Sequence, residues 1–204
     1  MCEAFHALNR EKQVKIINAA MKVFSESSYN KASTVDIAAI AGISKGALFY
    51  YFRNKRELYC YLYEYSCKKI YEKLDEVKAM EERDFFERNI KIVEARAAAM
   101  LDCPYIFAFS LQAYYEKDIS VAQDIKLINE KILKDAYAKL NENIDTSKFK
   151  NKEDINKAIK MIIWLSEGFI KERMAEGKLE LEEIKEEIYD YMKILKRGFY
   201  KEVL

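Results

Sequence analysis

The sequence predicts an all-α protein of about nine helices, and three observations lead to that fold class. The 204 residues include five glycines and one proline, too few for the many tight turns of a sandwich, a barrel or a glycine-looped nucleotide fold. Half of the residues are hydrophobic, which is enough for the core of one domain or of two small ones. Apolar residues recur at helical spacing along most of the chain.

Four helices are expected in the first 80 residues, at about 9–27, 34–41, 45–52 and 55–80. The first is strongly amphipathic. Ser33 or Thr34 can cap the second helix, and Gly42 ends it. Ser44 can cap the third helix, and the fourth is long enough to connect two halves of the chain.

The spacing within residues 33–52 is typical of a helix-turn-helix motif. Ile37 is the apolar residue of the first helix, and Ala38 is the small residue where the two helices cross. Gly42 can take the positive φ that the turn needs. Ile43 and Leu48 are apolar anchors for the second helix.

The N-terminal face of this second helix presents Lys45, Gly46 and Ala47, where a recognition helix meets base edges. Only Lys45 is long, so direct base readout is expected to be sparse and binding strongly salt-dependent. The four aromatics at 49–52 point all around a helix, so some must face outward. The alternative is a pair of core helices whose aromatics only pack.

The net charge of +1 hides a local asymmetry. Residues 1–60 contain nine Lys or Arg and five Asp or Glu, a net charge of +4. Because the whole chain carries +1, the remainder carries −3. Between Ser44 and Arg56 there are four basic residues and no acidic one. A local basic surface of this kind favours double-stranded DNA as a partner, whatever the total charge.

The stretch from Thr34 to Leu58 resembles the DNA-binding signature of the TetR/AcrR family of bacterial transcriptional regulators. The match is continuous from about Val14 and covers roughly a quarter of the chain. The resemblance implies a sequence-specific, homodimeric regulator, most often a repressor, that binds a pseudo-palindromic operator. It also implies a C-terminal domain that takes up a small molecule and thereby releases the DNA.

Carried over residue by residue, the resemblance assigns a set of DNA contacts. Thr34 and Ser44 would meet phosphates at helix N-termini, and Tyr51 stands where the family often has His. Phe49 departs from the pattern, since a Tyr is common there. The full predicted set is Thr34, Ser44, Lys45, Gly46, Ala47, Tyr50, Tyr51 and Lys55.

The predicted division is a DNA-binding domain at 1–57 and a helical ligand-sensing and dimerisation domain at 58–204. Further helices are expected at about 84–101, 105–116, 120–141, 152–176 and 182–201, with Gly177 as a C-cap. The residues at 141–151 form a polar loop in this reading. The long fourth helix would be the only segment that joins the two domains, and so the lever of a ligand-driven population shift.

The last two helices have apolar residues on more than one face, which indicates burial on two sides. One side can pack on its own subunit and the other can form a four-helix interface with a second copy. The residues predicted for this interface are Ile159, Ile163, Phe169, Ile188, Met192 and Leu195. The alternative is a monomer with a wide core.

A ligand site is expected among the aromatics, because residues 61–204 hold 19 of the 27. The residues predicted near a cavity are Phe107, Phe109, Tyr114, Tyr115, Tyr137 and Trp164. An aromatic or fatty-acyl molecule would suit them, but the sequence does not identify the effector.

Other functions have little support in the sequence. The single histidine, His6, lies in an N-terminus expected to fray, and four cysteines lack CxxC spacing, so no catalytic residue, metal or cofactor is expected. A helical prenyl-chain synthase would need a DDxxD motif, which is absent. No apolar run approaches a membrane span, so a cytoplasmic location without membrane contact is expected. The remaining alternative is a DNA-anchored interaction protein, such as a nucleoid-associated or division factor.

Overall fold

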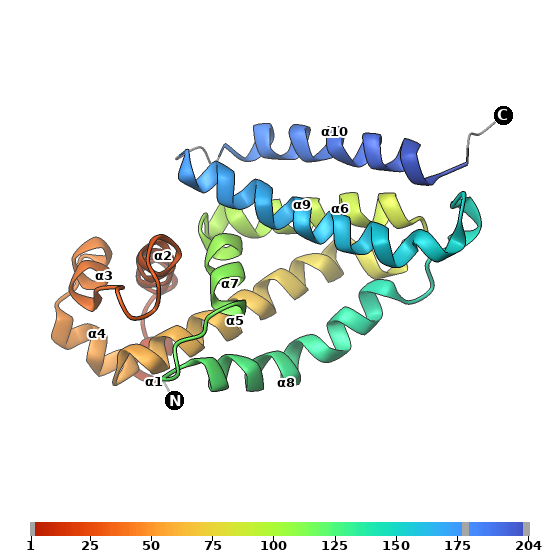
Figure 1. Cartoon of the computed structure of the whole chain (residues 1–204). Coiled ribbons are helices and arrows are strands. Elements are labelled where there is room, and N and C mark those ends of the chain that lie inside the picture. The colour runs from red at the N-terminus through yellow and green to blue at the C-terminus, as the bar shows by residue number, and fades with distance from the viewer. Residues whose placement is uncertain (1–2, 177–179, 202–204) are drawn as a thin grey trace. The chain divides into compact units, whose positions relative to one another are not determined.

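The computed structural model describes residues 3–176 and 180–201, and the side chains of these residues except 133–141 and 174. Its described part contains ten α-helices and three short 3-10 helices (Figure 1). The α-helices are α1 (Glu3–His6), α2 (Arg10–Glu26), α3 (Thr34–Ala41), α4 (Lys45–Phe52), α5 (Lys55–Glu76), α6 (Phe85–Asp102), α7 (Ile106–Tyr114), α8 (Ala122–Asn141), α9 (Ile155–Ala175) and α10 (Leu181–Phe199). The all-α prediction is confirmed, and the predicted C-cap at Gly177 lies outside the described residues.

The chain packs as two compact units. One unit extends through Lys69 and resumes from Ala99 to Ala136, and the other comprises Ile70–Ala98 and the chain from Tyr137 onward. We call them unit 1 and unit 2. Helices α5, α6 and α8 each pass from one unit to the other. The predicted single link through the helix at 55–80 concerns the predicted domains 1–57 and 58–204, which differ from these units, and it stays a prediction. The division at residues 57 and 58 concerns function and stays a prediction.

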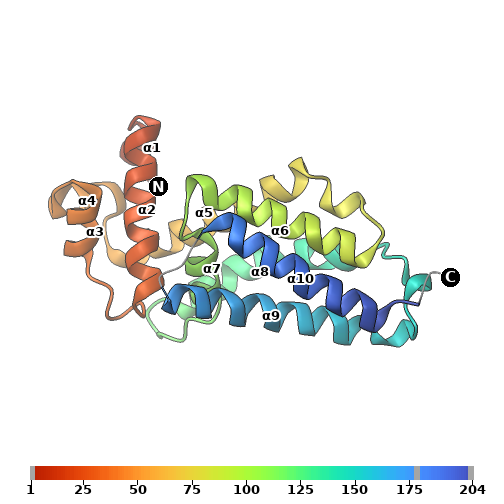
Figure 2. The same ribbon diagram turned by 90° about the horizontal axis from the view of Figure 1, so that it is seen from above.

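In unit 1, α2, α3 and α4 form a small bundle (Figures 1 and 2). A side-chain cap begins each of these helices. The Asn9 side chain accepts a hydrogen bond from the Lys12 N–H at 2.9 Å, and α2 begins there. Gly42 ends α3 with φ +69°, a left-handed conformation that strains other residues. The chain turns by 103° between α3 and α4, an angle typical of a helix-turn-helix.

Helix α1 packs its one large apolar side chain into this bundle. Phe5 is fully buried, with its ring centroid 4.7 Å from that of Phe52 and 5.4 Å from that of Tyr61. The expectation of a frayed N-terminus is therefore wrong for these residues. Burying one phenylalanine stabilises a helix that is too short to form alone.

An aromatic cluster forms the centre of unit 1 and contains one of the residues predicted for the ligand site. Tyr59 lies 4.8 Å from Phe24, 5.0 Å from Tyr29 and 5.2 Å from Phe109, measured between ring centroids. Phe109 has no exposed surface. The prediction that Phe109 lines a ligand cavity is thus corrected, because its ring fills the core between α2, α5 and α7.

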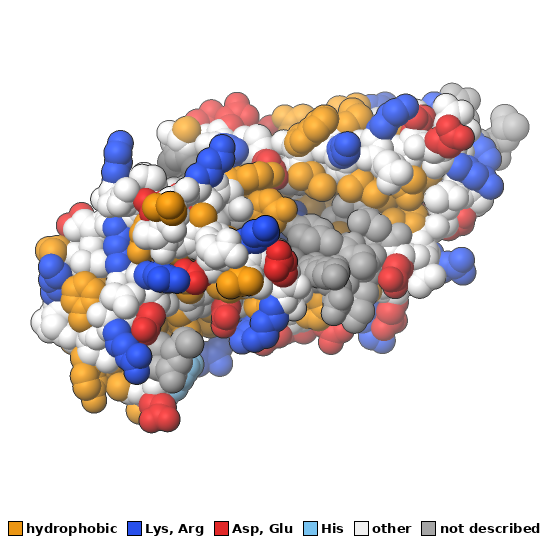
Figure 3. Space-filling view, turned by 60° about the horizontal axis from the view of Figure 1, so that its bottom comes forward, with side chains coloured by type: hydrophobic (Ala, Val, Ile, Leu, Met, Phe, Trp, Pro, Cys, Tyr) orange, Lys and Arg blue, Asp and Glu red, His pale blue; other side chains and the backbone are white. Residues whose placement is uncertain are grey.

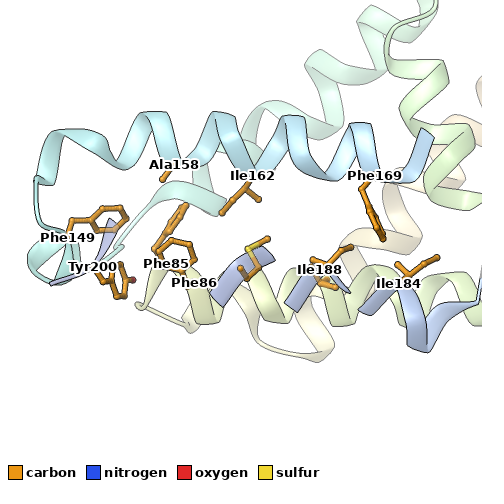
Figure 4. Close-up of a cluster of buried hydrophobic side chains, with 11 residues drawn as sticks. Phe85, Phe86, Phe149, Ala158, Ile162, Phe169, Ile184, Ile188 and Tyr200 are labelled. Atoms are coloured by element: carbon orange, nitrogen blue, oxygen red, sulfur yellow. The ribbon is translucent and has the colours of Figure 1, made fainter. Parts of the chain in front are cut away.

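The core of unit 2 lies between α6, α9 and α10, which run side by side in both views (Figures 1 and 2). Figure 4 shows Phe85 and Phe86 of α6 facing Ala158 and Ile162 of α9, with Phe149 and Tyr200 closing one end. Phe169, Ile188 and Met192, predicted for a dimer interface, are buried in this core. That prediction is wrong for these three residues, because they pack within their own chain.

A buried carboxylate connects three segments at the same end of unit 2. Asp84 accepts hydrogen bonds from Lys148 Nζ at 2.7 Å, from the Tyr200 hydroxyl at 3.1 Å and from the Phe86 N–H at 3.0 Å. Burial alone raises the pKa of Asp84, but the hydrogen bonds and the Lys148 charge outweigh it and hold the pKa below its ordinary value. The carboxylate therefore stabilises unit 2 when it is ionised.

Asp84→Asn should lower the free energy of unfolding at pH 7 by about 2 kcal/mol, because it weakens the Lys148 and Tyr200 contacts together. Since the folded pKa lies below the unfolded one, this stabilisation exists above the unfolded pKa and disappears as the pH falls through the folded value. Denaturant unfolding at pH 7 and pH 3 should show that the free energy of unfolding changes less with pH in Asp84→Asn than in the wild type. Asp190→Asn, at an exposed ion pair with Lys193, is the control. It should change neither the free energy of unfolding at pH 7 nor the dependence of that free energy on pH. Equal destabilisation by both variants would contradict the role given to Asp84.

Candidate nucleic-acid interface

Two serines begin the helices of the motif. The Ser33 hydroxyl accepts from the Asp36 N–H at 3.2 Å, and the Ser44 hydroxyl accepts from the Ala47 N–H at 3.0 Å. Thr34 is therefore the first residue of α3 and not its cap. The remaining N–H groups of the first turns stay available to an anion such as a DNA phosphate, as predicted for Thr34 and Ser44.

The first turn of α4 presents the predicted base-reading residues on the surface. Lys45 and Gly46 are exposed and Ala47 is half-buried. Lys45 Nζ lies 5.8 Å from the centroid of the Phe49 ring, which holds the cation beside an aromatic face. A Cβ at Gly46 would come no closer than 3.8 Å to another atom, the Ser44 hydroxyl oxygen. The fold itself thus does not require a glycine there, whereas close approach by a DNA groove would.

The aromatic residues at the end of α4 divide between surface and core. Tyr50 is 74% exposed, while Phe52 is buried. Tyr51 is half-buried and packs edge-on against Phe5 at 6.2 Å and against Tyr50 at 5.7 Å. The alternative of a purely structural helix pair does not explain why a large aromatic side chain such as Tyr50 points to solvent.

The basic residues that follow α4 have different roles within unit 1. Arg53 takes φ +49° after α4, and its side chain is 82% exposed. Lys55 Nζ donates to the Asn30 carbonyl at 3.1 Å and lies 4.8 Å from the Tyr29 ring, and burial lowers the pKa of Lys55. Arg56 pairs with Asp124. Arg53 is thus an additional candidate contact, which the run of cations in the sequence could not distinguish from its neighbours.

Basic, hydrophobic and some acidic side chains are intermixed over α2–α4. The left part of Figure 3 shows blue Lys and Arg side chains there, with orange hydrophobic and red acidic ones among them. The exposed members of the predicted set include Ser44, Lys45 and Tyr50. Ser44 and Lys45 lie at the N-terminus of α4, while Tyr50 lies four residues after the exposed Gly46 and so shares a helix face with it. This arrangement matches a helix that enters a major groove.

The residues predicted for the ligand site are not brought together in this way. Tyr114 and Tyr115 are exposed on unit 1, Phe107 is half-buried there, and Trp164 is 66% exposed on α9. The side chain of Tyr137 lies outside the described residues. An open groove of about 450 Å³ lies instead along α2, between residues 10–22, Ile40 and Tyr105, and none of the predicted residues lines it. Trp164 points to solvent, so its place in a cavity is corrected.

In the part of the chain that the structure describes, no single helix is both long and apolar enough to cross a membrane. The bent pair α3 and α4 would be long and apolar enough together, by length and composition only.

Comparison with known proteins agrees with this geometry. Residues 16–62 match the family described as bacterial regulatory proteins, tetR family. The fold of the whole chain resembles a TetR family transcriptional regulator from Chloroflexus aurantiacus, with a TM-score of 0.68, 20% identity and coverage of 98% of each chain. The segment at residues 16–62 therefore belongs to the tetR family of bacterial regulatory proteins, and the fold of the whole chain is similar to that of a TetR family regulator.

Two further similar proteins come from Bacillus subtilis. The fatty acid metabolism regulator protein is 25% identical over 154 residues, which are 75% of this chain and 78% of the relative. The regulator FadR in complex with stearoyl-CoA shares the fold, with a TM-score of 0.54, 18% identity and coverage of 87% and 96% of the two chains. The first similarity extends well beyond the DNA-binding segment.

Lys45→Ala should weaken operator binding by roughly tenfold or more and also reduce base preference, because Lys45 is the one long side chain in the first turn of α4. Lys55→Ala should weaken binding to all sequences about equally, because the predicted contact is to phosphate. Titration of operator and random DNA, with Lys126→Ala of α8 as a control, measures both effects. Equal losses on the two DNAs for Lys45→Ala would remove Lys45 from base reading.

Proposed function

We propose that this protein is a homodimeric repressor that binds a pseudo-palindromic operator through α4 and leaves it when a long-chain fatty acyl-CoA binds. The observation that carries the DNA-binding part is the exposed face of α4 within the matched residues 16–62. Two such helices related by a two-fold axis need half-sites about one helical turn apart, or a multiple of it. The residue contacts remain the predicted set, with Arg53 added.

A second copy would meet the outer faces of α9 and α10. On α9, Met161 and Trp164 are exposed and are followed by Gly168, where an added Cβ would meet open space. On α10, Tyr191 and Ile194 are exposed and are followed by Gly198, with open space again. Both sets have the spacing i, i+3, i+7, which forms one stripe on a helix. Ile163, 41% exposed, lies on α9 beside this stripe rather than in it, and we propose it for the edge of the interface.

These two stripes support an isologous four-helix interface. Large apolar side chains such as Trp164 are costly to leave in water, and the glycines allow close approach of a partner helix. Ile159 and Leu195 from the original prediction are half-buried against the core of unit 2 and would border this interface rather than form its centre.

The proposed effector comes from the relatives. A regulator of fatty acid metabolism is similar to this chain over three quarters of its length, and a related fold binds stearoyl-CoA. A hundredfold release from DNA would require the ligand to favour the DNA-free conformation by about the same factor, roughly 2.7 kcal/mol. A ligand with equal affinity for both conformations would release nothing.

Selection of bound sequences from a random DNA pool should return an inverted repeat. Stearoyl-CoA, added at micromolar concentration, should then release the protein from that repeat, while coenzyme A and stearate serve as controls. Release by neither stearoyl-CoA nor a shorter acyl-CoA would refute the effector. Binding to scattered, unrelated sequences would refute the operator and favour a DNA-anchored interaction protein.

A further inference from the structure

The connection between α7 and α8 holds the segment that precedes the helix-turn-helix motif. Gln112 Nε2 donates to the Ser27 carbonyl at 2.7 Å, and Glu116 Oε2 accepts from the Tyr29 N–H at 3.2 Å. Both partners belong to the turn between α2 and α3. Residues more than 80 positions apart in the sequence thus fix the backbone just before α3.

The connection is itself well ordered by hydrogen bonds. The other oxygen of Glu116, Oε1, accepts from the N–H groups of Lys117 and Asp118, each at 2.9 Å. Asp118 in turn accepts from the Ser120 N–H at 2.9 Å. The carboxylate that holds Tyr29 is therefore fixed from its own side, so it can act as a firm anchor.

An ion pair holds the segment that follows the motif. Arg56 Nε and Nη2 donate to the two carboxylate oxygens of Asp124 at 2.6 and 2.7 Å. This bidentate geometry joins the first turn of α5 to the first turn of α8, and the hydrogen bonds lower the pKa of Asp124. The Tyr63 hydroxyl donates to Asn129, which adds a contact farther along the same two helices. Arg56 is therefore engaged in an ion pair within unit 1, although its side chain is 58% exposed.

We propose that the start of α8 and the α7–α8 connection form a clamp that positions the recognition helix, with Asp124 and Glu116 as positioning residues. We call Gln112, Glu116 and Asp124 the clamp. It contacts the chain on both sides of residues 33–52, at Ser27 and Tyr29 before the motif and at Arg56 after it. A motif bracketed in this way cannot pivot about α5 alone.

The clamp fixes the orientation of the motif within unit 1, which is one condition for a dimer to present two recognition helices at a set separation. Each exposed ion pair stabilises the fold only slightly, so its value lies in orientation. A free motif would have to lose its orientational freedom when both half-sites are bound, which reduces affinity. A single half-site imposes no separation and should bind equally well with or without the clamp. This inference rests on the proposed binding of a two-fold operator.

Asp124→Asn tests the clamp, because the change of charge and the loss of the clamp should alter the affinity for the full operator in opposite directions. By charge alone, removing one carboxylate from unit 1 should strengthen binding to any DNA, because the protein becomes more positive. The clamp instead predicts roughly tenfold weaker binding to the full operator with no effector present, and unchanged or slightly stronger binding to an isolated half-site. Fluorescence anisotropy with the full-length protein and the two DNA lengths measures both.

Two further variants complete the experiment. Glu64→Gln makes the same change of charge at a carboxylate that pairs with Lys68 within α5, outside the clamp, and should leave the ratio of full-operator to half-site affinity as in the wild type. The exchange Arg56→Asp with Asp124→Arg should restore that ratio. If Asp124→Asn lost binding to both DNAs, unit 1 would be misfolded in that variant. If the Arg56→Asp, Asp124→Arg exchange then failed to restore binding, the positioning role would be refuted.

The outcomes separate the clamp from the proposed function. If the wild type binds a half-site as tightly as the full operator, the two-fold operator proposal fails. If the wild type prefers the full operator and Asp124→Asn keeps that preference, the clamp is refuted and dimeric binding stands.

Discussion

Trp164→Glu should convert the protein to a monomer and weaken binding to the full operator by about 100-fold or more, because one recognition helix would then bind without the second. Trp164 is 66% exposed on α9, between Met161 and Gly168 in the proposed stripe. A buried carboxylate without a partner at the centre of a four-helix interface would be strongly unfavourable. Sedimentation velocity measures the oligomeric state, and anisotropy measures binding to the operator.

Leu127→Glu is the matched control for this prediction. Leu127 is also an exposed apolar residue in a helix, 52% exposed on α8, but it lies outside the proposed interface. It should leave the dimer and operator binding unchanged. A Trp164→Glu protein that remains a dimer would refute the interface on α9 and α10, since a charged residue could not be tolerated at its centre.

Phe5→Ala should lower the free energy of unfolding by about 3 kcal/mol or more, as expected for a large aromatic side chain removed from a full core. Phe5 is fully buried against Phe52 of α4 and Tyr61 of α5. The same change should weaken operator binding, because α1 and α4 are in contact and α4 would lose part of its support. Denaturant unfolding monitored by circular dichroism gives the first value.

Phe5→Leu should recover most of this stability, because leucine fills much of the same volume. Glu3→Ala, at an exposed position in the same short helix, should have no measurable effect. If Phe5→Ala were as stable as the wild type, α1 would not be part of the folded core of unit 1.

Local structure near the motif was predictable because its determinants are close in sequence. Helices α2, α3 and α4 begin and end within about one residue of the expected positions. Asn9, Ser33 and Ser44 cap them through hydrogen bonds to N–H groups three residues ahead, and Gly42 ends α3 by its own conformation. Such signals depend on no distant partner. Helix α5, in contrast, ends at Glu76 before Lys78 adopts φ +51°, without a glycine or proline to mark it.

By itself, the sequence determined the fold class and the helices of the helix-turn-helix motif, because composition, caps and helical spacing are local properties. Only the tertiary structure decided which side of α9 and α10 is core, since apolar residues on two faces do not say which face meets α6. In that structure Phe169, Ile188 and Met192 lie in the core of unit 2, whereas Trp164 is exposed to solvent. The tertiary structure also decided that Arg56 pairs with Asp124, 68 residues away, while Lys45 stays in solvent. A charge in the sequence has no partner until the fold brings one near it.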